Sequence, residues 1–249
     1  MSRARAHVVA VAVSIAAALC AGCGAGATAG GAQRPPVKAS TTSTAVPPPA
    51  ARPRGEQAPR PQIRQRRIPL TAQRRRETVA YAQRHYGLRH WTIARPRVIV
   101  EHLTENDSVD ATWNTFAPDV PDIELHELPG LCSQFVIARD GAIYQLTPVR
   151  FMCRHTVGLN WAAIGIEHVA LSEDDVLARH AQLSASLHLT RWLRCRYRIP
   201  VRDVIGHAES LSSPFHRERV AALRTQTHAD WQARAMRRYR ALLRAQGGC

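Results

Sequence analysis

The 249-residue chain carries 34 lysine and arginine side chains against 19 carboxylates, a formal net charge of +15. Such a charge is compatible with an anionic partner, but the basic residues follow no recognised DNA-binding pattern and are not interleaved with aromatic residues, which argues against nucleic acid. We expect an anionic cell envelope to be the partner instead, and no nucleic acid.

Residues 1–23 have the layout of an export signal. Two arginines near the start precede an apolar run over 8–19 and small residues before Cys23, which is typical of an export signal rather than a membrane span. We therefore expect an exported protein of the cell envelope. The stretch Cys20-Ala-Gly-Cys23 also resembles a bacterial lipobox, in which Cys23 would be lipidated and anchor the protein to the membrane. A plain signal peptide cleaved nearby is the alternative, because Cys20 stands where Leu is usual.

Residues 24–69 are predicted to be a disordered linker. The segment is rich in Ala, Gly, Thr, Pro and Arg with almost no large apolar side chain, so it cannot bury enough surface to offset its ordering entropy. Six prolines between 47 and 61 favour an extended tether. The remaining residues, 70–249, have the size of one ordinary domain with a single core.

Within residues 70–249 the predicted helices and strands alternate. Helices are expected over 71–86, where Gly87 ends the helix, over 172–197, where Ser172 begins a capping box, and over 230–244. Strands rich in β-branched residues are expected over 98–102, 135–138, 142–146, 163–169 and 204–207. Arg139-Asp-Gly141 favours a tight hairpin turn between two of these strands. The pattern predicts a single α/β domain with a central mixed β-sheet flanked by helices.

Two predicted strands end in histidine, and an acidic residue follows near the C-terminus. His102 and His207 end their strands, and Asp230 closes a His228-Ala-Asp230 triplet. Neutral imidazole and carboxylate are good zinc ligands, and a catalytic zinc site uses three protein ligands and leaves the fourth position open. We expect His102, His207 and Asp230 to hold Zn²⁺.

Glu167 ends a further strand, Ile164-Gly-Ile-Glu167. Because strand side chains alternate in direction, Gly165 and Glu167 share one face, and the carboxylate is expected to face the cleft beside a residue that cannot obstruct substrate. Glu167 need not bind metal, so it is free to act as general base on a water molecule. The alternative is an ion pair with one of the many arginines. The reaction class indicated is metal-assisted hydrolysis.

Five stretches between residues 98 and 231 occur in a specific order, although each alone is weak. They are Val98-Ile-Val-Glu-His102, Phe135–Leu146, Arg154-His-Thr-Val-Gly-Leu-Asn160, Ile164-Gly-Ile-Glu167 and Ile205-Gly-His207. With them the chain resembles the type 2 N-acetylmuramoyl-L-alanine amidase family, which shares its fold with the peptidoglycan recognition proteins. The resemblance implies the same zinc ligands, Glu167 as the catalytic glutamate, and hydrolysis of the amide bond between N-acetylmuramic acid and L-alanine in peptidoglycan.

The C-terminal motif departs from that family. Many members carry Lys-Thr-Asp or Lys-Thr-Cys, with the lysine on the oxyanion and the last residue on zinc, whereas Lys38 is the only lysine of this chain. The simplest alignment puts His228 in the place of the lysine, where its imidazole would stabilise the same charge and act as a catalytic residue. A shifted alignment makes His228 the third zinc ligand. We favour Asp230, which keeps two histidines and one carboxylate.

The resemblance also places the 154–160 stretch near the glycan cleft. His155 and Asn160 are therefore expected to contact substrate, although His155 is nearly as compatible with a core histidine. Two further functions remain open: a non-catalytic peptidoglycan-binding protein on the same fold, which the missing lysine favours, and a zinc peptidase, which the absence of a His-Glu-x-x-His motif disfavours.

Four cysteines lie in the expected domain. Export to an oxidising compartment would allow Cys132 and Cys153, which bracket the predicted hairpin, to form a disulfide. Cys195 and Cys249 would then form a second bridge or stay free. Three pairings are compatible with four cysteines, as are free thiols, and the sequence does not choose among them.

Overall fold

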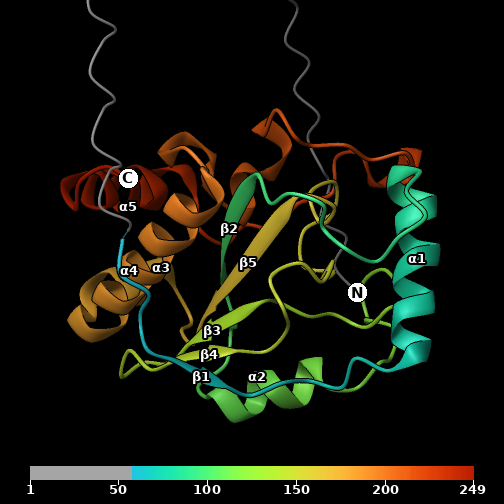
Figure 1. Ribbon diagram of the computed structural model, residues 1–249, viewed down its shortest axis with the longest axis horizontal. Coiled ribbons are helices and arrows are strands. Elements are labelled where there is room, and N and C mark those ends of the chain that lie inside the picture. Colours follow the sequence, from blue (N-terminus) through green and yellow to red (C-terminus); the bar gives the residue numbers. More distant parts are fainter. Residues whose placement is uncertain (1–57) are drawn as a thin grey trace, which may run out of the picture. The chain divides into compact units, whose positions relative to one another are not determined.

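A six-stranded mixed sheet forms the centre of residues 58–249, the part of the chain that the computed structural model describes (Figure 1). Its strands are β1 (Ile63–Gln65), β2 (Val98–Leu103), β3 (Phe135–Ile137), β4 (Ile143–Gln145), β5 (Ala163–His168) and β6 (Val204–Gly206). Their order across the sheet is β1-β4-β3-β5-β2-β6, with β3 and β4 antiparallel and the other neighbours parallel. The predicted fold class is confirmed.

The folded part of the chain begins earlier than the expected boundary after residue 69. β1 pairs with β4, and the Ile68 amide donates a hydrogen bond to the Leu146 carbonyl at 3.1 Å while its side chain is buried. The prediction of a linker is therefore wrong for residues 58–69, because an edge strand can draw its hydrogen bonds from a neighbour that local composition does not reveal. Residues 24–57, and the expected signal and lipobox, lie outside the described residues.

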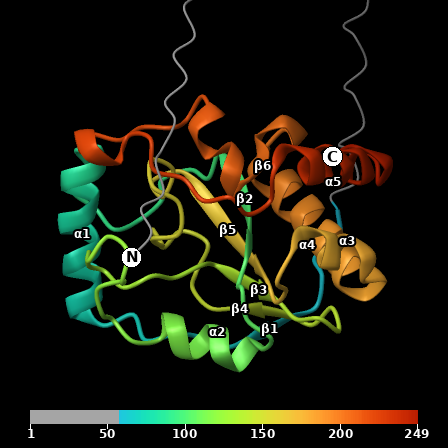
Figure 2. The ribbon, with the colours of Figure 1, turned by 180° about the vertical axis from the view of Figure 1, so that it is seen from behind.

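Helices cover both faces of the sheet, as Figures 1 and 2 show from opposite sides. They are α1 (Ala72–Tyr86), α2 (Val109–Phe116), α3 (Glu173–Ala178), α4 (His180–Tyr197) and α5 (Ala233–Ala245), with short 3₁₀ segments at Val201–Asp203, His207–Ser212 and Ala221–Leu223. Ile164 and Ile166 of β5 pack with α4 and α5 in the main core. Among residues 58–249, no helix combines the length and apolarity needed to cross a membrane.

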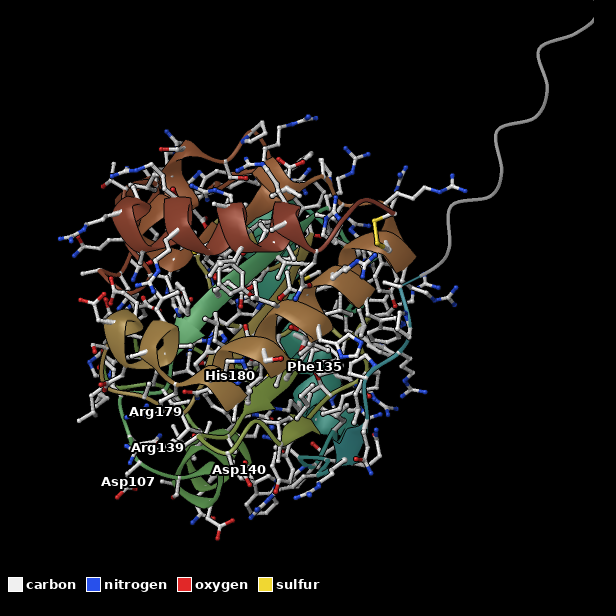
Figure 3. The ribbon with its side chains drawn as sticks, turned by 90° about the vertical axis from the view of Figure 1, so that its left-hand side faces the viewer. Asp107, Phe135, Arg139, Asp140, Arg179 and His180 are labelled. Carbon is white, nitrogen blue, oxygen red and sulfur yellow. A yellow bond between two sulfur atoms is a disulfide. The ribbon has the colours of Figure 1, made fainter. Side chains whose placement is uncertain are left out.

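The single long helix predicted over 172–197 is in fact two helices. Arg179 has an extended backbone, with φ −83° and ψ 99°, and separates α3 from α4; Figure 3 shows it at this junction with His180. The Gln182 side chain at the start of α4 donates to the carbonyls of Ile137 and Val169. These contacts fix where α4 begins, and no glycine or proline announces the break in the sequence.

Two disulfides are present, and they are one of the three pairings that the sequence left open. Cys132–Cys153 joins the segments on either side of the β3–β4 hairpin, and Cys195–Cys249 joins α4 to the C-terminus. The hairpin itself turns at Arg139 and Asp140, which Figure 3 shows next to the start of α4. Gly141 has φ +86°, and a Cβ there would lie 2.7 Å from the Ala181 carbonyl oxygen. The close approach of the hairpin turn to α4 therefore requires a glycine at position 141.

Candidate metal centre and cleft

The candidate site lies at the carboxyl ends of three adjacent parallel strands. His102 near the end of β2 is paired in register with Glu167 of β5, and Gly206 ends β6 immediately before His207. Figure 2 shows β6 beside β2. Since parallel strands end at the same edge of a sheet, the chain brings these side chains together although they are far apart in sequence.

His102, His207 and Asp230 form a group whose candidate ligand atoms all lie within 4.8 Å of one another. The Asp230 carboxylate stands 3.6 Å from His102 Nδ1 and 3.2 Å from His207 Nδ1. Ligands at zinc bond lengths in a tetrahedral site are about 3.4 Å apart, so the spacing fits the metal. Two imidazoles and one carboxylate are also a donor set that zinc accepts.

The ligand forms of Asp230 and His207 are favoured in the absence of metal. Burial alone would raise the pKa of Asp230, but hydrogen bonds and charges from His102 and His207 hold that pKa far below its usual range. Burial lowers the pKa of His207 to about 4. An ionised carboxylate and a neutral imidazole are the states that bind zinc. For His102, burial alone would lower the pKa, but the Glu167 charge and the Asp230 hydrogen bond and charge raise it, so zinc must displace a proton there.

Asp230 is placed by the backbone of a loop, because α5 begins at Ala233 and not at Asp230 as predicted. The Leu103 amide donates to the Asp230 carboxylate at 3.2 Å, and the Ala208 amide donates to the Asp230 carbonyl at 3.0 Å. Gly206 permits this approach, since a Cβ there would lie 1.7 Å from the Trp231 carbonyl oxygen. The glycine of the Gly-His motif is therefore a packing requirement of the metal centre.

The second nitrogen of His102 has its own partners. Its Nε2 lies 3.0 Å from His155 Nδ1 and 3.3 Å from Thr156 Oγ1. Burial and the nearby histidine charges hold the pKa of His155 well below its usual value, so this ring is neutral and its Nδ1 can accept a hydrogen bond. Hydrogen bonding of the free ring nitrogen is typical of histidines that bind metal.

Gly165 does not serve the purpose that the sequence suggested. A Cβ at this position would lie 2.8 Å from Ser133 Oγ and 3.0 Å from the His155 ring. The missing side chain makes room for His155, which lines the cleft, and not for substrate directly.

Asn160 is fully buried and does not line the cleft. Its Oδ1 accepts hydrogen bonds from the amides of His155 and Thr156, and its Nδ2 donates to the Tyr81 hydroxyl. The expectation that Asn160 contacts substrate is wrong in this geometry, because its polar atoms are already engaged. It holds the turn that presents His155.

Glu167 lines the cleft beside the His-His-Asp group without belonging to it. It is 5% exposed, and burial raises its pKa to about 7 although the charge of His102 opposes the shift. A carboxylate whose pKa lies near neutrality is suited to accept and return a proton.

His228 stands at the edge of the site. Its ring centroid lies 4.7 Å from that of His207, and its Nε2 lies 3.1 Å from a Glu124 carboxylate oxygen and 3.0 Å from Gln226 Nε2. Its side chain is half exposed, and it is not part of the three-residue metal group. Glu124 is a neighbour that the sequence analysis missed, since nothing near residue 124 marks it as functional.

A buried polar network supports His102 from behind the sheet. His168 Nδ1 and the Trp231 indole nitrogen both donate to the His102 carbonyl, at 2.9 and 3.2 Å. His168 in turn contacts Ser186 Oγ of α4 at 2.8 Å, and the buried Glu101 carboxylate lies 3.8 Å from the same ring. Alternate residues of β2 and β5 thus face a metal group on one side and a hydrogen-bonded core on the other.

A cleft of about 280 Å³ opens over these residues. Besides the metal group and Glu167, it is lined by residues of the segments 103–106, 112–116, 122–131 and 154–157 and by Gln226 and His228. The model of one protein family, N-acetylmuramoyl-L-alanine amidase, matches residues 92–231, more than half of the chain. The chain belongs to this amidase family. The matched range contains every residue of the candidate metal group.

Solved structures that are similar to the chain include amidases and peptidoglycan recognition proteins. The endolysin amidase LysCS from Clostridium intestinale is 22% identical, with 60% of this chain and 83% of that one covered and a TM-score of 0.41. AmiD from E. coli is 22% identical over 46% and 49%, with a TM-score of 0.35. PGRP-SA from Apis mellifera is 20% identical over 46% and 73%, with a TM-score of 0.35. No curated protein matches the sequence.

Proposed function

We propose that this member of the amidase family is a zinc-dependent hydrolase that cleaves the amide bond between N-acetylmuramic acid and L-alanine in peptidoglycan. The proposal rests on the His102, His207 and Asp230 group, whose candidate ligand atoms lie within 4.8 Å of one another. The buried Glu167 carboxylate lies next to this group without being part of it. Family membership supports peptidoglycan as the substrate or binding partner.

The residues of the site divide into those that would bind the metal and one that transfers a proton. His102, His207 and Asp230 would hold the metal, and His155 and Thr156 orient the His102 ring. A bound zinc ion supplies Lewis-acid polarisation of the substrate carbonyl and lowers the pKa of water. The Glu167 carboxylate accepts the proton of the attacking water and returns it to the leaving amine as the amide bond breaks.

His228 takes the place of the lysine that many relatives carry. It lies at the mouth of the site against His207, where its ring can donate a hydrogen bond to the oxyanion that forms on the substrate carbonyl. The Glu124 carboxylate lies 3.1 Å from His228 Nε2, close enough to pair with the ring when the ring is protonated. The chain would replace a flexible ammonium group by a positioned imidazole.

A non-catalytic peptidoglycan-binding protein is the second candidate, and the absence of lysine from residues 58–249 favours it. The complete donor set and the buried Glu167 argue for the enzyme, because a receptor requires neither. The proposed location is the cell envelope, which the protein would reach by export. It would be anchored there by lipidated Cys23 or secreted without an anchor.

The proposal is tested by zinc content and digestion. The purified chain should carry near-stoichiometric zinc, lose its ability to solubilise purified peptidoglycan when the metal is removed with chelator, and regain it when zinc is restored. Unchanged digestion by fully metal-free protein would reject the zinc mechanism. Stoichiometric zinc without any digestion would favour the binding protein.

A further inference from the structure

One surface of the domain, formed by parts of α4 and α5, is rich in arginine, and the neighbouring helix α3 adds the acidic residues Glu173, Asp174 and Asp175 at its start. Residues 189–203 and 231–249, which include most of the second half of α4 and all of α5, contain one carboxylate side chain, Asp203. Their arginines are Arg191, Arg194, Arg196, Arg198, Arg202, Arg234, Arg237, Arg238, Arg240 and Arg244. We call this the α4–α5 basic face. The acidic residues that line the cleft lie in other segments of the chain.

The fold directs four of the five arginines of α5 outward. On α5 the side chains of Ala235, Met236, Tyr239 and Leu243 are buried in the main core, whereas Arg234, Arg237, Arg238 and Arg244 are exposed. Figure 3 views α5 from outside, with nitrogen-tipped side chains projecting away from the helix. Within the described residues α5 makes one ion pair, Arg240 with Glu209. The other arginines of α5 therefore keep their charge available for an external partner.

The two helices present these charges as one rigid surface. Tyr239 of α5 hydrogen-bonds to Ser186 and Thr190 of α4, and the Cys195–Cys249 disulfide joins α4 to the C-terminus. Helix α5 has 13 residues, a length of about 20 Å at the usual rise per residue. A charged area that extends along one helix and across to a second matches a planar array of charges better than a single polymer strand.

The first described residues also lie at this face. The Arg60 guanidinium lies 5.5 Å from the centre of the Trp192 ring of α4, and Ala58 is buried. Figure 1 shows these residues running beside α4. Arg60 therefore adds a further cation next to α4.

We propose that the α4–α5 basic face docks on a bilayer surface of anionic phospholipid. Arginines near such a surface are attracted to the lipid phosphates, and the attraction adds to any lipid chain, which alone gives marginal binding. The inference is independent of the hydrolase activity. It also extends the sequence-based expectation, in which the membrane was contacted only through Cys23.

The test compares vesicle binding by two variants of the full chain with the same change in charge. The first carries Arg234→Gln, Arg237→Gln, Arg238→Gln and Arg244→Gln. The control carries the same replacement at four exposed arginines outside the face, Arg76, Arg89, Arg95 and Arg139. Vesicles of phosphatidylcholine alone measure binding through the apolar N-terminal run, and vesicles containing phosphatidylglycerol measure the electrostatic part.

Wild-type protein should bind the anionic vesicles more strongly than the neutral ones, and high salt should abolish the difference because it screens surface charges. The extra affinity for anionic over neutral vesicles should fall by roughly tenfold or more in the basic-face variant, whereas the control variant should keep most of it. Equal losses in both variants would overturn the proposal, since net charge alone would then explain the binding. Equal binding of the wild type to anionic and neutral vesicles would also overturn it. If the wild type then bound inorganic polyphosphate and the basic-face variant did not, the partner would be an anionic polymer. The pair Arg237→Gln and Arg238→Gln repeats the comparison if the fourfold variant melts at a lower temperature than the wild type.

Discussion

His102 and Glu167 occupy paired positions on adjacent parallel strands, so the first metal-binding side chain and the candidate base project from the same edge of the sheet. Their backbones are held together by the β2–β5 ladder and not by loops. Burial of this edge raises the pKa of Glu167 to about 7. The relationship makes separate predictions for metal binding and for proton transfer.

Glu167→Gln removes the proton acceptor while keeping the size of the side chain. The expected result is a loss of kcat of about a hundredfold or more, because general-base assistance is removed. Zinc content should be unchanged, since Glu167 is not part of the ligand group. A variant that retains wild-type kcat, or that loses its zinc, would contradict the role assigned to this carboxylate.

Asp230 and His228 are distinguished by metal content. Asp230 lies between the two histidine rings, so Asp230→Ala should lose most of its bound zinc. His228→Ala should keep the metal and lower kcat by roughly a hundredfold, as for loss of one oxyanion donor. Zinc measured on both purified variants decides between the two alignments. Loss of zinc from His228→Ala with retention in Asp230→Ala would make His228 the third ligand.

Gly206→Ala should damage the metal centre through packing alone. The added Cβ would lie 1.7 Å from the Trp231 carbonyl oxygen, next to Asp230, so the loop must move at a cost of about 3 kcal/mol of unfolding free energy. We expect lower zinc affinity and a lower melting temperature. Gly248→Ala is the control, because a Cβ there meets nothing within 4 Å. Wild-type zinc affinity in Gly206→Ala would show that the close approach is dispensable.

His85 predicts a pH dependence that is separate from the metal. Its two ring nitrogens contact Glu218 at 2.8 Å and Glu127 at 3.1 Å, and it lies on α1, away from the zinc ligands. Burial alone would lower the pKa of His85, but the hydrogen bonds and charges of both carboxylates raise it above its usual value. Because the folded-state pKa is the higher one, the stabilisation is complete below the unfolded-state pKa of about 6.5 and is lost as pH rises through the raised value.

His85→Gln should therefore cost about 3 kcal/mol at pH 6, since it leaves the buried Glu218 carboxylate without its cation, whereas Glu127 keeps Arg84. The difference from wild type should shrink between pH 6 and pH 9. Denaturant unfolding at several pH values measures it, and His180→Gln, at an exposed histidine, should show no such trend. A constant difference across this range would mean that His85 is not protonated in the folded protein.

The predictable parts of the fold were those that local pattern determines. α1 begins and ends as expected because Thr71 accepts a hydrogen bond from the Arg74 amide and Gly87 adopts a left-handed backbone. The central strands β2 and β5 carry continuous β-branched or apolar runs. The parts that failed depend on distant partners: β1 takes its hydrogen bonds from β4, and the break at Arg179 follows from contacts of Gln182.

The candidate site divides in the same way. His102, His207 and Asp230 were identified from strand ends and motif order, and the structure brings them together. Glu124 and Asn160 could not be assigned correctly, because the role of each depends on a side chain brought near by folding. No local pattern shows that Glu124 contacts His228, or that the Asn160 side chain accepts a hydrogen bond from the His155 amide.

The chemical identity of the released fragments shows which bond the protein cleaves. Purified peptidoglycan should be digested with the zinc-loaded chain and with Glu167→Gln, and the soluble products examined by mass spectrometry. We expect intact stem peptides with a free L-alanine amine and glycan strands that retain an unsubstituted lactyl carboxylate, with at least about a hundredfold less of both from Glu167→Gln. Soluble fragments in which L-alanine is still joined to muramic acid, or no fragments from zinc-loaded protein, would contradict the proposed function.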